Sequence, residues 1–142
     1  MTSLLEIVQK IESYCARDAT ILAAYLFGSY ARGRQGPMSD VDIAVLLEER
    51  GGKIDRKLLH ARLHHDLGRL LRKDIHILIL NDASYLARIE AMFNGRCVHV
   101  KDDEALARFK MLSSSLFADF APYMDQLHRR LKQHLGVNHH GQ

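Results

Sequence analysis

The fold of this chain is decided by two neighbouring segments, LFGSYARG at residues 26–33 and SDVDI at residues 39–43. The first segment predicts an apolar strand, a sharp turn at Gly28 and a short helix opened by Ser29. Glycine lets a backbone approach a ligand closely, and the free N–H groups at a helix start attract anions such as phosphate. We therefore expect a phosphate-binding turn between two strands.

Two carboxylates stand in the second segment, at Asp40 and Asp42. Residues two apart on a strand point to the same face of the sheet. Paired carboxylates opposite a phosphate cradle are what a magnesium–nucleotide site requires, because this cation prefers oxygen ligands. The pair therefore predicts a site for magnesium and a nucleotide.

The composition is typical of an ordinary globular chain. It has 142 residues, of which 47% are hydrophobic, and a net charge of +3. We expect one α/β domain over residues 1–142, with a frayed polar tail at about 136–142. Nothing argues for nucleic-acid binding, and no apolar run is long enough to span a membrane. The distant Cys15 and Cys97, and the lack of a signal-peptide pattern, favour a reduced, cytoplasmic chain.

Hydrophobic periodicity predicts alternating helices and strands. Helices are expected at 3–17, 55–72 and 83–93 and from 102 or 103 onward, and strands at 21–27, 41–47, 74–80 and 97–100. We expect Asn81 and Asp82 to cap the third helix, and Pro122 to kink or split the last one. The fold that follows is a small mixed sheet with helices packed over it.

Two apolar stripes mark the helix faces that should meet the core. The expected core face of the second helix consists of Leu58, Leu59, Leu63, Leu67, Leu70 and Leu71. That of the last helix consists of Leu106, Phe109, Leu112, Leu116, Phe120, Met124, Leu127 and Leu131. An exposed remainder of this second stripe could form a groove for a partner.

The order Gly28-Ser29, ten residues, then Asp40-x-Asp42 resembles the signature of the polymerase-β-like nucleotidyltransferase superfamily. That signature continues with a third Asp on a later strand, and here Asp74 opens the third predicted strand. Within the superfamily the chain is similar to the minimal nucleotidyltransferase (MNT) proteins, the antitoxins encoded beside HEPN-domain toxins. The resemblance covers essentially the whole chain, and it implies the nucleotidyltransferase fold.

The resemblance implies a role for each carboxylate. Asp40 and Asp42 would hold magnesium ions, two in number, that bridge the phosphates of ATP. Asp74 would complete the second metal site and help to deprotonate the attacking hydroxyl. The alternative for Asp74 is a capping or ion-paired residue at a strand start, because Lys73 precedes it.

The resemblance also implies which residues bind the phosphates of the nucleotide. The turn at Gly28 and Ser29 would bind the outer phosphates of the nucleotide. Arg32 lies one helical turn after Ser29, and the resemblance makes it a further phosphate ligand, with Arg34 as a lesser candidate. A solvated helix charge is the alternative for Arg32.

The function that the resemblance implies is transfer of AMP from ATP to a hydroxyl, expected to be a tyrosine, of a partner HEPN ribonuclease toxin. Such an antitoxin would form an oligomeric complex with its toxin. Two alternatives stay open: an antitoxin that masks the toxin by binding alone, and a small-molecule nucleotidyltransferase that modifies, for example, an antibiotic.

Two histidines are candidates for a separate metal site. His60 and His64 stand four apart on the predicted second helix, a spacing that can bind a metal. No HExxH glutamate or nearby cysteine accompanies them, so a solvated helix face is the simpler interpretation. His76 shares a strand face with Asp74 and so could lie near the metals, but we expect it to be held by core hydrogen bonds.

Overall fold

The computed structural model describes residues 3–31, 33 and 40–136. Its centre is a mixed sheet with the strand order β3-β2-β1-β4. The strands are β1 (Ile21–Phe27), β2 (Val41–Leu47), β3 (Ile75–Ile79) and β4 (Arg96–Val100). β1 runs antiparallel to both β2 and β4, whereas β2 and β3 are parallel. The predicted α/β fold with a small mixed sheet is therefore confirmed.

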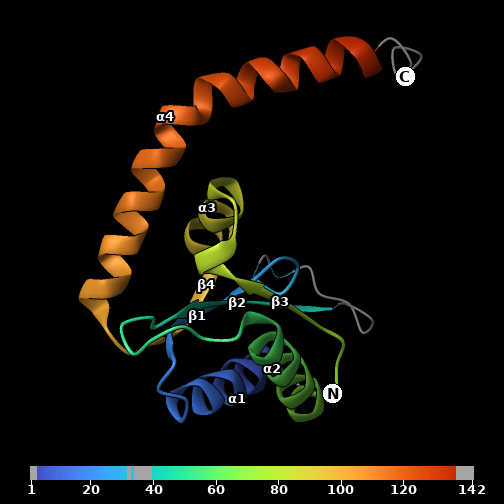
Figure 1. The fold of residues 1–142 in the computed structure, drawn as a ribbon. Coiled ribbons are helices and arrows are strands. Elements are labelled where there is room, and N and C mark those ends of the chain that lie inside the picture. The colour runs from blue at the N-terminus through green and yellow to red at the C-terminus, as the bar shows by residue number, and fades with distance from the viewer. Residues whose placement is uncertain (1–2, 32, 34–39, 137–142) are drawn as a thin grey trace.

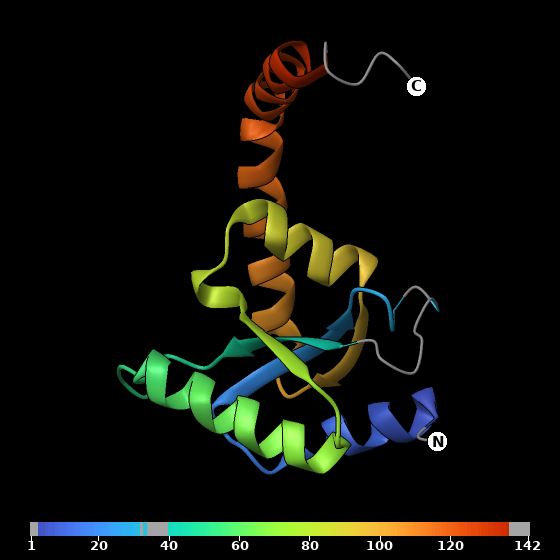
Figure 2. The ribbon, with the colours of Figure 1, turned by 90° about the vertical axis from the view of Figure 1, so that its right-hand side faces the viewer.

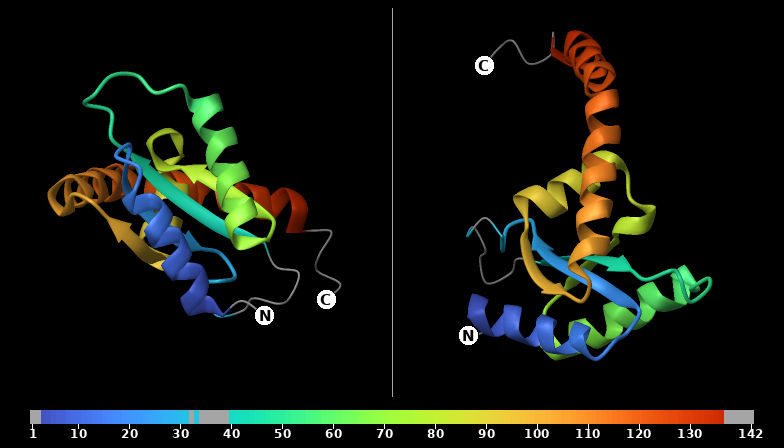
Figure 3. Two further views of the ribbon diagram at one scale, coloured as in Figure 1. Left: turned by 90° about the horizontal axis from the view of Figure 1, so that it is seen from below. Right: turned by 90° about the vertical axis from the view of Figure 1, so that its left-hand side faces the viewer.

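Helices cover the two faces of the sheet (Figures 1 and 2). One face packs against α1 (Leu4–Ala16) and α2 (Arg56–Leu71), which lie side by side when the molecule is seen from below (Figure 3). The opposite face packs against α3 (Tyr85–Asn94) and the start of α4 (Asp103–Gly136). The sheet thus separates two apolar clusters, one on each side.

The first two helices begin where the sequence predicts. Ser3 accepts a hydrogen bond from the Glu6 N–H at 3.2 Å and caps α1. Asp55 accepts from the Leu58 N–H at 3.1 Å and caps α2. These caps depend on residues three apart in sequence, which is why a local pattern reveals them.

The predicted cap of the third helix is wrong. α3 begins later because Ser84, not Asn81 or Asp82, accepts from the Ala87 N–H, at 3.2 Å. Residues Leu80–Asp82 form the short 3₁₀ helix η1. Asn81 there accepts from the Leu47 N–H at 2.9 Å and donates to the Leu47 carbonyl at 3.1 Å. The amide therefore ties η1 to the end of β2 and is not free to cap.

The core face of α2 is narrower than predicted. Leu59, Leu63, Leu67 and Leu71 are buried in a single row with four-residue spacing. Leu58 is 69% exposed and Leu70 is 38% exposed. Each of these two residues directly precedes a buried leucine, so it points about 100° away from the buried row.

The last helix is one element with Pro122 inside it. Figure 1 shows that α4 bends and extends away from the sheet, so the predicted kink is confirmed and a split is not seen. Leu106 is buried, but Leu112 and Leu127 are more than half exposed, so the prediction that they belong to the core is wrong. The reason is that none of the described helices and strands covers the extended part of α4 (Figure 1). The side chains of Phe120, Met124 and Leu131, and the tail at 137–142, lie outside the described part.

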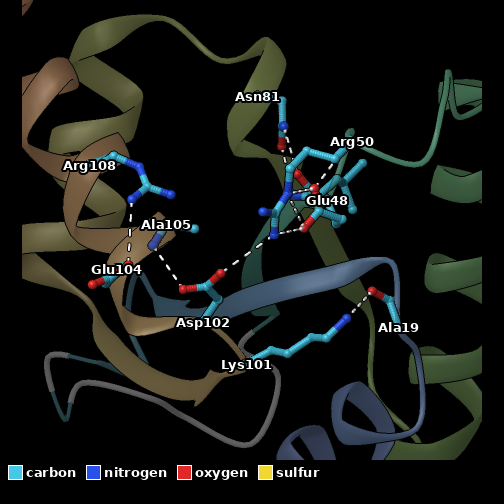
Figure 4. A network of polar contacts seen from close by, with 10 residues as sticks. Ala19, Glu48, Arg50, Asn81, Lys101, Asp102, Glu104, Ala105 and Arg108 are labelled. Carbon is cyan, nitrogen blue, oxygen red and sulfur yellow. Dashed lines mark hydrogen bonds and ion pairs between the residues drawn. The ribbon is translucent and has the colours of Figure 1, made fainter.

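A polar network joins the end of β2 to the start of α4 (Figure 4). Glu48 accepts from Arg50 Nη2 at 2.8 Å, and the same Arg50 nitrogen lies 3.6 Å from Asp102. Asp102 also accepts from the Ala105 N–H and so caps α4, as predicted. No helix in the described ranges is long and apolar enough to cross a bilayer.

Candidate active site

The segment after β1 forms turns where the sequence predicts a short helix. Gly28 has φ +71°, and Gly33 has φ +68°. The Gly33 N–H donates to the Tyr30 carbonyl at 3.4 Å, and Gly28–Ala31 form turns, not a helix. The short helix predicted at Ser29 is therefore wrong for these residues, which form turns after the left-handed backbone of Gly28. Tyr30 is buried in the core shared with α1 and α2, which anchors the turn.

Gly28 brings its backbone against the carboxylate of Asp42. Phe27 pairs with Asp42 across β1 and β2, so the turn lies beside this residue. A Cβ atom at position 28 would collide with Oδ2 of Asp42 and lie 3.1 Å from its Cγ. Only glycine fits this contact without moving the carboxylate. The glycine turn and Asp42, one of the two carboxylates predicted on this strand, are thus brought together.

The carboxylates occupy the start of β2. Asp42 points to the face covered by α3 and α4, because its neighbours Val41 and Ile43 are buried on the opposite face. Its side chain is 25% exposed, and Asp40, two residues earlier, is exposed. Burial raises the pKa of Asp42 above its ordinary value, and the charge of Asp40 raises it further, whereas His76 lowers it. A bound cation would offset both unfavourable effects.

His76 on β3 lies next to Asp42. The two residues are paired in the parallel register of β2 and β3, and His76 Nδ1 lies 3.4 Å from Asp42 Oδ1. The His76 side chain is 67% exposed, so the prediction of a core histidine is wrong. The sequence indicates which face of β3 carries His76. It does not indicate the register of β3 against β2, because that register pairs residues 34 positions apart.

Asp74 lies just before β3 and is exposed. Its carbonyl accepts from the Val41 N–H at 2.9 Å, which starts the pairing of the two parallel strands. This places the backbone of Asp74 beside the start of β2. Its predicted role as the third metal ligand stays a prediction. Arg32 and Arg34 lie outside the described residues, and Ser29 is half-buried in the turn.

The donor set fits magnesium bound together with a nucleotide. Magnesium keeps several waters and is held by one or two carboxylates plus substrate phosphates. Asp42 on β2 supplies a carboxylate beside the Gly28 backbone, and the exposed Asp40, two residues earlier and just before β2, supplies a second one. Among the described residues there is no cluster of three His, Cys, Asp or Glu side chains that would enclose an ion by itself. Phosphate oxygens from a nucleotide would therefore have to complete the coordination.

Two other features lie on the far side of the sheet. His60 and His64 stack on α2 with ring centroids 6.4 Å apart, and His60 Nε2 lies 3.2 Å from the Ile77 carbonyl. A surface pocket of about 360 Å³ lies between α1 and α2, where Tyr14 donates to Asp66 at 2.7 Å. Neither feature contributes to the carboxylate site.

A family model described as polymerase beta, nucleotidyltransferase matches residues 9–104. The match includes the glycine turn, Asp40, Asp42 and all of β3. The chain therefore belongs to this nucleotidyltransferase family. A comparison with curated proteins gave no match.

Solved structures extend the likeness over most of the chain. A chain in a toxin–antitoxin crystal structure with AMP-PNP is 26% identical, with 84% of this chain and 97% of that chain covered and a TM-score of 0.64. A chain in a complex of tri-AMPylated Shewanella oneidensis HEPN toxin with MNT antitoxin is 23% identical, with 88% and 98% covered and a TM-score of 0.61. The second likeness shows a common fold alone.

Proposed function

We propose that this chain is a magnesium-dependent nucleotidyltransferase antitoxin. It transfers AMP from ATP to a hydroxyl, expected to be a tyrosine, of a HEPN ribonuclease toxin and so neutralises the toxin. The observation that carries this proposal is the close contact of the Gly28 backbone with Asp42, inside a nucleotidyltransferase domain. The nearly full-length likeness to a toxin–antitoxin structure with AMP-PNP supports both the nucleotide and the kind of partner.

The residues of this chain act mainly by positioning charge. Asp40 and Asp42 would hold the magnesium, which when bound neutralises the phosphates and the departing pyrophosphate. The turn at Gly28 and Ser29 would direct N–H groups and one hydroxyl at the outer phosphates. Arg32 would add a positive charge on the leaving side. These assignments keep Asp74 as the candidate group that accepts the proton of the attacking hydroxyl.

The reaction exchanges one P–O bond for another. The toxin hydroxyl oxygen forms a bond to the α-phosphorus of ATP, and the bond from that phosphorus to the bridging oxygen breaks. Pyrophosphate leaves, and the hydroxyl proton passes to a carboxylate or to water. The product carries a bulky anion on the toxin, and an anion near an RNA-binding site would repel the RNA backbone.

Masking by contact is a second candidate function. It is favoured by the exposed apolar side chains of α4, among them Leu112, Tyr123 and Leu127, on a helix that extends from the body (Figure 3). A masking antitoxin needs affinity for the toxin but not a working nucleotide site. A small-molecule nucleotidyltransferase would instead modify its substrate without a toxin.

Mass spectrometry separates these functions. The purified HEPN toxin is incubated with this chain, ATP and magnesium, and the toxin mass is measured. We expect one or more AMP additions that disappear with EDTA and return with magnesium or manganese, since both prefer oxygen ligands. Toxin neutralised without any change in mass would favour masking, and full modification in EDTA would contradict the metal-dependent mechanism.

A further inference from the structure

A ring nitrogen of His76 lies beside the partly buried carboxylate of the candidate metal site. We propose that His76 Nδ1 binds the same divalent cation as Asp42, so that an imidazole and carboxylates together set the metal preference. This inference rests on the proposed function, because it needs a cation at Asp42. It differs from the expectation of three carboxylates in the identity of the third ligand.

The first argument is position. β2 and β3 are parallel, and Asp42 and His76 are direct neighbours in their register. Both point to the face of α3 and α4, because Ile75 and Ile77 on either side of His76 are buried on the other face. The imidazole and the carboxylate are therefore held beside each other by two strands, not by a flexible loop.

The second argument is the distance. His76 Nδ1 and Asp42 Oδ1 are 3.4 Å apart. A direct N–H···O hydrogen bond is usually about 2.7–3.2 Å long. Neighbouring ligands of an octahedral ion with bonds of about 2.1 Å lie about 3.0 Å apart, and those of a tetrahedral ion lie about 3.4 Å apart. The separation is longer than a direct hydrogen bond and slightly longer than the octahedral value, so the exposed imidazole would have to turn toward Asp42 to share an octahedral Mg²⁺ or Mn²⁺ with it.

The third argument is access. The His76 side chain is 67% exposed and stands on β3, the edge strand of the sheet. Asp42 is only 25% exposed, and the Gly28 backbone closes one side of it. A cation that enters from solvent would meet Asp42 on its open side, which is the side of His76. The uncovered imidazole has the freedom to turn a ring nitrogen toward it.

The chemical consequence is a changed metal preference. Carboxylates and phosphates suit Mg²⁺ and Mn²⁺, whereas imidazole binds first-row transition metals better than Mg²⁺. A site that includes His76 should favour Mn²⁺ over Mg²⁺ more strongly than a site built from carboxylates alone. The substitution His76→Asp should therefore shift the preference back toward Mg²⁺.

The test measures metal binding, not transfer. Free Mn²⁺ is followed by electron paramagnetic resonance while the full chain is titrated in the presence of AMP-PNP. We expect His76→Ala to weaken Mn²⁺ binding at least about tenfold. We expect His76→Asp to retain binding but to let Mg²⁺ displace Mn²⁺ more easily. The substitution His65→Ala, an exposed histidine on α2, is the matched control and should bind Mn²⁺ as the unchanged chain does.

Variants of Asp74 and Asp42 distinguish a failure of the His76 inference from a failure of the proposed metal site. Equal Mn²⁺ affinity in His76→Ala and the unchanged chain would overturn the inference, and loss of binding in Asp74→Asn alone would assign the third ligand to Asp74. If Asp42→Asn also kept its Mn²⁺ affinity, the proposed metal site would be wrong together with His76. Circular dichroism of each variant shows that a loss of binding is not a loss of folding.

Discussion

The two faces of the central sheet can be compared strand by strand. On the face of α1 and α2, alternate residues of β2 and β3 are apolar and buried, among them Val41, Ile43 and Ile77. On the other face the same strands carry Asp42 and His76, with a carboxylate near the glycine turn and an exposed imidazole. One strand thus supports a core with one side and a polar site with the other, because side chains alternate along it.

Along β2, the buried residues that fix the strand and the carboxylate that serves the site are separated by a single residue step. The buried residues on either side of Asp42 fix the position of its carboxylate. The same packing partly buries the carboxylate, and this burial raises the pKa of Asp42. Substitutions at Asp42 and His76 should therefore change transfer more than stability, and substitutions in the buried cluster under α1 and α2 should do the reverse.

The largest effect is expected for Asp40→Asn combined with Asp42→Asn. Transfer should fall at least about 1000-fold, equivalent to about 4 kcal/mol of activation free energy, because the charges that hold the cation are gone. The melting temperature without metal should stay the same or rise, since a partly buried charge is removed. Toxin modification by mass spectrometry and a thermal melt check both halves. Normal modification in magnesium would show that these residues are not the metal ligands.

The next effect belongs to the apolar face. Leu63 on α2 is fully buried, so Leu63→Ala should lower the free energy of unfolding by about 2–5 kcal/mol. The rate of transfer per folded molecule should change little. Leu58→Ala is the matched control on the same helix, because Leu58 is exposed and its loss should cost under about 0.5 kcal/mol. Urea denaturation of both variants tests the difference, and equal losses would contradict the narrow core face of α2.

A smaller effect is expected at the contact between the turn and β2. Gly28→Ala adds a Cβ that collides with Asp42 at a backbone φ of +71°. The strain should cost about 1–2 kcal/mol of stability, and transfer should fall further because the carboxylate must move. Gly51→Ala is the control, since a Cβ there meets nothing within 4 Å. If the Gly28→Ala protein transfers AMP normally, the close contact is not needed for the site.

The smallest effect is a dependence of stability on pH. The raised pKa of Asp42 means that the folded state keeps its proton longer than the unfolded state. As pH rises above the ordinary carboxyl value, the metal-free chain should lose stability until the folded-state pKa is passed. Asp42→Asn lacks this loss, so it should be the more stable protein at neutral pH and gain nothing in strong acid. Urea titrations at several pH values measure the gap, and a gap that widens toward acid would contradict the sign.

The sequence by itself determined the elements and the motif. Ser3 and Asp55 cap helices through bonds to residues three further on, and periodicity of two and 3.6 residues marks strands and helices. The glycine turn followed by Asp40 and Asp42 is equally local. All of these signals lie within a few residues of chain, and so they can be read before any folding is considered.

The tertiary structure alone decided which groups meet. Asn81 does not cap α3 because its amide binds the backbone of Leu47. Leu112 and Leu127 are exposed because no element of the described ranges covers α4 beyond the sheet. His76 faces Asp42 because β3 pairs in parallel with β2 in one particular register. Such pairings join residues far apart in sequence, and they are chosen by the packing of the whole core and not by any local preference.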